Sequence, residues 1–183
     1  MRRMFTAGVV LILAAATTQS VHAQGAADRR QGFWLNAGLG WGSLGVSCSY
    51  CGSTTRESAV AGNFALGGTV GHSLLLGVES DGWSKDESGV TLNSWNLSGV
   101  AYYYPVPAGG LFLKGGVGVG GWTASAGGSS DTESGLGFIA GLGYDIPVGK
   151  KVSISPTATF RWSKVVDDIE QNVIQLGASF TLH

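Results

Sequence analysis

Four charged side chains lie in segments of the sequence that otherwise consist of small and apolar residues. Two are acidic and two are basic: Glu79, Asp81, Lys114 and Arg161. An unpaired charge away from water is costly, so opposite charges that share an interior are expected to pair. We predict two ion pairs, Glu79–Lys114 and Asp81–Arg161. Such pairs suit either a structural plug or the gate of a narrow channel for protons, ions or small solutes.

A second group that could carry chemistry is the cysteine pair Cys48 and Cys51, in the sequence C-S-Y-C. A redox pair of the thioredoxin type needs a helix in a βαβ setting, which the surrounding sequence lacks. A metal site needs further ligands nearby, and none accompanies the two cysteines. Disulfides are usual in exported proteins. We therefore predict a disulfide that closes the tip of a loop.

Two histidines and many glycines bear on whether the chain is an enzyme. A barrel enzyme that modifies lipid A needs a histidine beside a serine or carboxylate at the outer-leaflet end. His72 lies in a short turn-like connection at 71–73 and His183 follows the last segment of alternating residues, so we expect both at the opposite, short-turn end. The glycine run 116–121 is not followed by a helix, which a phosphate-binding loop requires. We predict no enzyme activity, and no catalytic, cofactor-binding or metal-binding residue.

The elements that must position these residues are segments in which apolar and small or polar residues alternate. In the last of them, Ile174, Leu176 and Phe180 share one face, and Gln175 and Gly177 share the other. A period of two is typical of a β-strand with one apolar face. Eight segments show this pattern: 33–41, 60–70, 74–81, 94–103, 111–119, 136–144, 152–162 and 172–182.

The connections between these segments are of two kinds. Short, turn-like connections lie at 71–73, 105–109 and 147–150, and longer polar ones at 46–57, 84–89, 123–133 and 164–171. Outer-membrane barrels have short periplasmic turns and longer external loops, with strands of about ten residues. We predict that segment 172–182 pairs with segment 33–41 and closes the ring, and that any recognition lies in the external loops.

Composition favours a membrane barrel. Only 13% of residues are charged, and 31 residues are glycine. The net charge of −1 lacks the positive excess that binding to nucleic acid requires. A soluble lipocalin-like barrel that binds a ligand is the alternative. Its apolar faces would point inward, but the apolar side chains here are too bulky to fit inside a barrel of eight strands. Aromatic residues gather at strand ends, as the girdles of membrane barrels do. They are Phe33, Tyr103, Tyr144 and Phe180 at the short-turn end, and Trp41, Trp95 and Trp162 at the long-loop end.

The N-terminal residues predict export. Arg2 and Arg3 precede an apolar stretch, and Val21-His22-Ala23 has the small residues of a cleavage site. We predict a signal peptide at 1–23, a short periplasmic segment at 24–31 and a barrel domain at 32–183.

The segment 31–183 resembles the small eight-stranded outer-membrane proteins, the OmpA/OmpX-like outer membrane protein β-barrel domain. The most specific match is a C-terminal pattern formed by Gln175, Gly177, Phe180 and Leu182. The resemblance implies an all-β, eight-stranded, antiparallel up-and-down transmembrane barrel in the cell outer membrane of a Gram-negative bacterium. It also implies a monomer that contacts outer-membrane lipids and lipopolysaccharide, is assembled by the barrel-assembly machinery, and has a structural or surface-interaction role.

Overall fold

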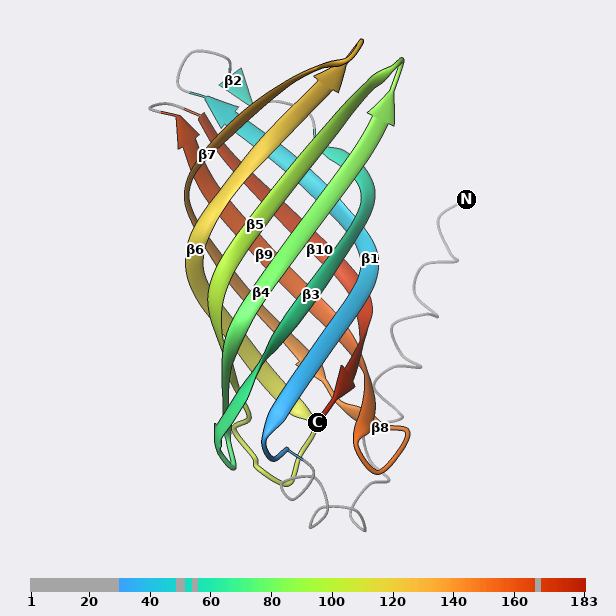
Figure 1. The fold of residues 1–183 in the computed structure, drawn as a ribbon, viewed down its shortest axis with the longest axis vertical. Coiled ribbons are helices and arrows are strands. Elements are labelled where there is room, and N and C mark those ends of the chain that lie inside the picture. Colours follow the sequence, from blue (N-terminus) through green and yellow to red (C-terminus); the bar gives the residue numbers. More distant parts are fainter. Residues whose placement is uncertain (1–29, 49–51, 54–55, 167–168) are drawn as a thin grey trace, which may run out of the picture.

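A computed structural model describes residues 30–48, 52–53, 56–166 and 169–183, and in them the chain forms a closed antiparallel β-barrel (Figure 1). The predicted signal peptide lies outside these residues. Eight long strands form the wall: β1 (Phe33–Cys48), β3 (Glu57–Gly71), β4 (Leu74–Glu87), β5 (Val90–Tyr103), β6 (Leu111–Ala126), β7 (Ser129–Tyr144), β9 (Val152–Val166) and β10 (Ile169–Leu182). Two short strands, β2 (Gly52–Ser53) and β8 (Ile146–Pro147), pair with β1 and β9.

The barrel closes through the pairing of β10 with β1. Leu35 pairs with Leu182, and Trp41 pairs with Leu176, in one continuous antiparallel register. Every other long strand pairs with its neighbours in chain order. The predicted eight-stranded up-and-down barrel, and the predicted closure by its first and last strands, are confirmed.

The strands are longer than the sequence predicts. They run for 14 to 16 residues, and the β4–β5 and β6–β7 hairpins end in turns of two residues. Ser88 and Gly89 have φ of 52° and 81°, and Gly127 and Gly128 have φ of 56° and 87°. Two consecutive positive φ values make the turn that matches strand twist in hairpins. The prediction that 84–89 and 123–133 are long loops is therefore wrong, because all of these residues except the two-residue turns continue the strand ladders.

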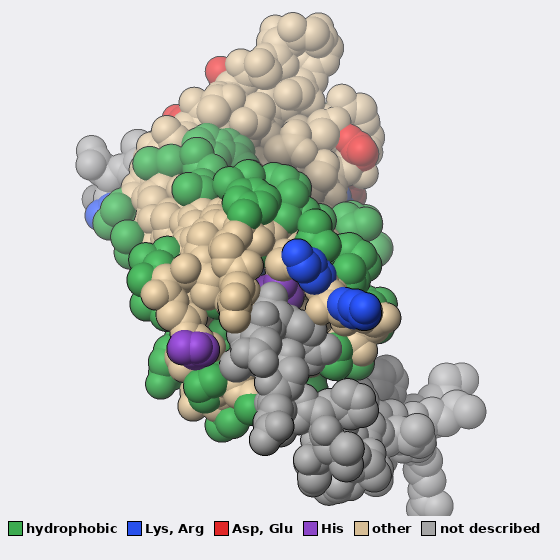
Figure 2. All heavy atoms as spheres, turned by 60° about the horizontal axis from the view of Figure 1, so that its bottom comes forward, with side chains coloured by type: hydrophobic (Ala, Val, Ile, Leu, Met, Phe, Trp, Pro, Cys, Tyr) green, Lys and Arg blue, Asp and Glu red, His purple; other side chains and the backbone are tan. Residues whose placement is uncertain are grey.

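The outer wall is apolar. Phe33, Trp41, Tyr103 and Phe180 are exposed on it, as predicted for girdle residues. Tyr144 is also exposed, whereas Trp95 and Trp162 are half-buried, and the Trp162 ring packs in a tilted arrangement against Phe138 at 5.4 Å between ring centroids. Figure 2 shows apolar side chains around the wall, with the visible acidic side chains at the far end. No helix in the described ranges is both long and apolar enough to cross a membrane.

The interior contains two apolar clusters at different heights. We call the end with the turns at 72–73, 104–110 and 145–151 the lower mouth, and the end with the hairpin turns the upper mouth (Figure 1). The lower cluster consists of Trp34, Ala65, Leu75, Val100, Tyr102, Tyr104, Phe112 and Ile139. The upper cluster consists of Leu44, Ala59, Ala61, Trp83 and Val173.

Glycines on the inner face make room for the rings of both clusters. A Cβ atom at Gly143 would lie 2.9 Å from Phe112 Cε1, and one at Gly42 would lie 2.7 Å from Trp83 Cδ1. Both distances are below any ordinary carbon–carbon contact. Large rings therefore fit in the interior where glycine lies beside them on a nearby strand, as Gly143 does next to Phe112 across the β6–β7 ladder.

Candidate functional site

The predicted lumen charges begin with an ion pair between Glu79 of β4 and Lys114 of β6. Lys114 Nζ donates to Glu79 Oε1, and the two side chains are 3% and 0% exposed. Tyr102 of β5 donates its hydroxyl to Glu79 Oε2 at 2.6 Å. Both carboxylate oxygens are therefore satisfied by strands on the same side of the barrel. The prediction of a Glu79–Lys114 pair is confirmed.

The predicted pair between Asp81 and Arg161 is wrong. Both side chains are buried, but no ion pair within 4.0 Å joins them, and both carboxylate oxygens of Asp81 lack hydrogen-bond partners among the described residues. Equal counts from a turn do not fix the distance between side chains on tilted strands that are not neighbours. The two charges here act on one another through space without direct contact. Asp81 pairs with Asn96 across the β4–β5 ladder, and Arg161 borders a small cavity with the same Asn96 and with Ser94 and Ser163.

A second polar cluster closes the lower mouth around Asp145, between β7 and β8. Tyr104 and Ser155 donate hydroxyls to Asp145 at 2.9 and 2.6 Å, and Arg30 Nε and His183 Nε2 each lie 3.7 Å from its Oδ2. Arg30 also donates to Pro107 O and Gly109 O, and its guanidinium lies 3.5 Å from the Tyr104 ring centroid. We call Arg30, Tyr104, Asp145, Ser155 and His183 the lower latch.

The lower latch determines the titration of its own groups. Burial by itself raises the pKa of Asp145, but contacts with His183, Ser155 and Tyr104 outweigh burial, so this pKa lies below its ordinary value. Burial and the negative charge of Asp145 raise the pKa of Tyr104 well above its ordinary value. The latch therefore keeps Asp145 ionised and Tyr104 protonated at neutral pH.

Replacing Asp145 with asparagine is expected to lower the free energy of unfolding by about 1.5–3 kcal/mol, because a buried charged hydrogen-bond acceptor is lost. A lowered folded-state pKa gives stability that is present above the ordinary value of 3.8 and is lost as pH falls through the folded pKa. Wild type should lose this contribution in acid, and Asp145→Asn should lack that loss. Urea unfolding in detergent at several pH values measures both, with the exposed Asp131→Asn as control. Equal stability of D145N and wild type at neutral pH would contradict the role of the latch.

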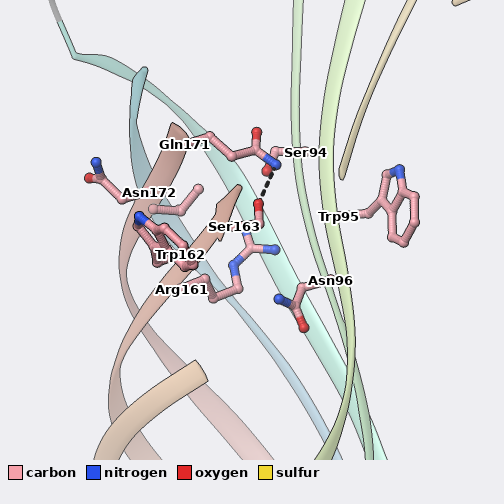
Figure 3. Close-up of a pocket in the computed structure, with 9 residues that line it drawn as sticks. Ser94, Trp95, Asn96, Arg161, Trp162, Ser163, Gln171 and Asn172 are labelled. Carbon is pink, nitrogen blue, oxygen red and sulfur yellow. Dashed lines mark hydrogen bonds between the residues drawn. The ribbon is translucent and has the colours of Figure 1, made fainter. Parts of the chain in front are cut away.

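At the upper mouth, the side chain of Gln171 spans the interior. Its Nε2 donates to Gly121 O at 2.8 Å. It also donates to Ser163 Oγ at 2.8 Å (Figure 3). Below it lies a small cavity of about 10 Å³ that Arg161 and Asn96 border. A larger cavity of about 240 Å³ adjoins it, and Ser94 and Gln171 line both. The larger cavity is lined by Leu44, Val46, Leu92, Ser94, Trp122, Ile169 and Gln171.

The rim of the upper mouth carries more acidic than basic side chains in the part of the chain that the structure describes. Lys85 Nζ lies 2.7 Å from Glu57 Oε2 and 2.6 Å from Glu87 Oε2, and Arg56 donates to Asn172 Oδ1 at 2.7 Å. The side chains of Lys85 and Arg56 therefore already have polar partners within the protein. The basic residues of the rim are Arg56, Lys85 and Lys164, and the acidic ones are Glu57, Asp86, Glu87, Asp131, Glu133 and Glu170.

The remaining predicted residues lie as follows. Gln175 and Gly177 face the interior from β10, and Phe180 and Leu182 face outward, so the C-terminal pattern lies on the strand that closes the barrel. Its role in assembly stays a prediction. Cys51 and the side chain of Cys48 lie outside the described residues, so their disulfide also stays a prediction. No group of three or more histidine, cysteine or acidic residues suited to a metal is found in the described ranges.

Comparisons with known proteins agree with the geometry. A family model described as "Outer membrane protein beta-barrel domain" matches residues 9–181. Ail, the attachment invasion locus protein of Yersinia pestis, is 16% identical with a TM-score of 0.59, over 83% of this chain and 99% of Ail. Neisserial surface protein A is 17% identical with a TM-score of 0.56, over 83% of this chain and 97% of that protein. Ail has also been solved in complex with the heparin analogue sucrose octasulfate. No curated protein matches the sequence.

Proposed function

Because the chain belongs to the outer membrane protein β-barrel family, we propose that it is an outer-membrane protein whose closed lumen acts as a structural plug and whose upper-mouth hairpins contact partners outside the cell. Membership in this family makes it an outer-membrane barrel rather than a soluble lipocalin-like one. A structural or surface-interaction role is the proposal that its interior supports best.

The observation that carries the proposal is the filled interior. The lower latch, the lower cluster with the Glu79–Lys114 pair, and the upper cluster occupy successive heights, and each contains side chains less than 5% exposed. Eight strands leave an interior that is just wide enough for side chains to fill. A filled interior of this size favours a structural plug rather than a gated channel.

The upper rim supports a particular class of partner. Ail was solved with a sulfated polyanion, but the described residues at the rim of this chain include six acidic side chains against three basic ones. Like charges repel, so such a rim disfavours a sulfated polyanion. Its hairpin strands instead present serine, threonine and carboxylate groups to solvent, which suit a basic or hydrogen-bonding protein surface.

Epitope insertion tests the proposal on intact cells. A tag between Gly127 and Gly128 is expected to bind antibody from outside and to abolish attachment of the cells to surfaces or to one another. A tag between His72 and Ser73, at the lower mouth, should be hidden from antibody and leave attachment unchanged. Antibody binding to the lower tag, or attachment that survives the upper tag, would count against the proposal.

A further inference from the structure

The 240 Å³ cavity at the upper mouth has an unusual position. Its residues lie further along β1 and β5 toward the upper mouth than the girdle residues Trp41 and Trp95, and its side chains Val46 and Leu92 pack against the upper cluster, to which Leu44 belongs. Elsewhere, the parts of the strands that extend beyond the upper girdle residues are largely polar on both faces. Apolar residues around a recess outside the hydrocarbon region indicate a binding site.

The polar groups of the cavity carry no charge. Ser94 is 3% exposed, and its side chain makes no hydrogen bond within the described part of the chain. The amide nitrogen of Gln171 donates to Gly121 O and Ser163 Oγ, so its Oε1 is left as an acceptor. Ser94 and Gln171 together offer a hydroxyl and an acceptor, which complement a hydroxyl on a ligand.

Arg161 is the nearest buried cation, but the cavity does not reach it. Its Nε and Nη2 lack hydrogen-bond partners among the described residues, and of the two cavities at the upper mouth it borders the smaller one, of about 10 Å³ (Figure 3). That volume holds about one water molecule. The Gln171–Ser163 hydrogen bond lies between the guanidinium and the larger cavity. A ligand carboxylate in the larger cavity would therefore be buried without a counter-charge, which is costly.

We propose that the upper-mouth cavity binds one small neutral amphiphile with a single hydroxyl. An engineered cavity of about 150 Å³ binds benzene, so this cavity accommodates about ten non-hydrogen atoms. The apolar chain of the ligand packs among Leu44, Leu92 and Trp122, and its hydroxyl bonds to Ser94 and Gln171. A medium-chain alcohol such as 1-octanol has this size and chemistry.

The test is a titration of the full barrel in lipid nanodiscs with 1-octanol, followed by NMR of isotopically labelled Leu, Val and Ile methyl groups. The methyl signals of Leu44, Val46 and Ile169 are expected to shift and saturate. Signals of the lipid-facing Leu97 and Val119 report partition into the bilayer and should shift without saturation. Parallel, unsaturated shifts at both sets would overturn the proposal.

Three variants sharpen the result. Leu92→Trp fills the cavity and should abolish the saturable shift, whereas Leu97→Trp, on the lipid face of the same strand, should retain it. Ser94→Ala should weaken octanol binding about two- to tenfold, the effect of one hydrogen bond. If L92W does not fold, the alcohol series in wild type decides, with saturation expected for octanol and lost for hexadecanol.

The charge of the ligand is tested by comparing octanol with octanoate. Weaker binding of octanoate, unaffected by Arg161→Gln, supports a neutral site. If octanoate binds more tightly than octanol, and Arg161→Gln removes this difference, the proposal is overturned. That result would show that Arg161 binds a ligand carboxylate at this site.

Discussion

Replacing Lys114 with methionine is expected to destabilise the folded barrel by about 3–5 kcal/mol, because it leaves the carboxylate of Glu79 buried without its cation. Glu79 is 0% exposed and, within the described part of the chain, keeps the hydroxyl of Tyr102 as its remaining hydrogen-bond partner. Urea unfolding in detergent, followed by tryptophan fluorescence, measures the loss. A change smaller than about 1 kcal/mol would contradict a buried ion pair at this position.

Two controls separate the pair from the substitution itself. Glu79→Gln together with Lys114→Met removes both charges, and it should recover most of the lost stability. Lys85→Met removes an ion pair at the solvent-exposed rim, and it should change stability much less than Lys114→Met. A double variant no more stable than K114M would show that the loss comes from packing.

Replacing Gly40 with valine is expected to abolish folding. Gly40 of β1 faces Gly177 of β10 at the closing seam, and a Cβ atom there would lie 2.6 Å from Gly177 Cα. Because the contact is with backbone, the strands would have to separate rather than rotate a side chain. The measurement is the folded fraction on gels of unheated samples, where folded and unfolded barrels migrate differently.

The matched control for this substitution is Gly68→Val. Gly68 lies on β3 with an exposed outer face, and a Cβ atom there meets nothing within 4 Å. G68V should therefore fold like wild type. Normal folding of G40V would show that β1 and β10 are not held in the described register.

The closing seam and one ion pair were predictable because each follows from parity along the chain. Alternation places Ile174, Leu176 and Phe180 on the lipid face, and a one-residue slip would reverse every side chain of β10. Glu79 and Lys114 are both inward by the same rule. The distance between Arg161 and Asp81 depends on the stagger between strands that are not neighbours. Inward or outward alternation along the chain gives no information on that stagger.

The hairpin extensions and the lower latch were missed for different reasons. Beyond the membrane both faces of a strand are polar, so the period-two signal fades, although Ser88-Gly89 and Gly127-Gly128 were themselves signals for two-residue turns. Tyr104 and Asp145 continue the inward alternation of Tyr102 and Gly143 by one step past their strands. Arg30 belongs to the segment 24–31, which we predicted to be periplasmic. This segment shows no alternation of apolar and polar residues that would have placed Arg30 beside Asp145.

The central claim is that this outer-membrane barrel is plugged, and conductance of the wild-type protein in a planar lipid bilayer tests it most directly. With insertion verified, and with a porin recorded in the same bilayer as the positive control, no discrete current steps are expected at neutral pH. The lower latch, the Glu79–Lys114 layer and the upper cluster should together leave ions no continuous path. Reproducible unitary steps from the folded wild-type barrel would contradict the plug and support a gated channel.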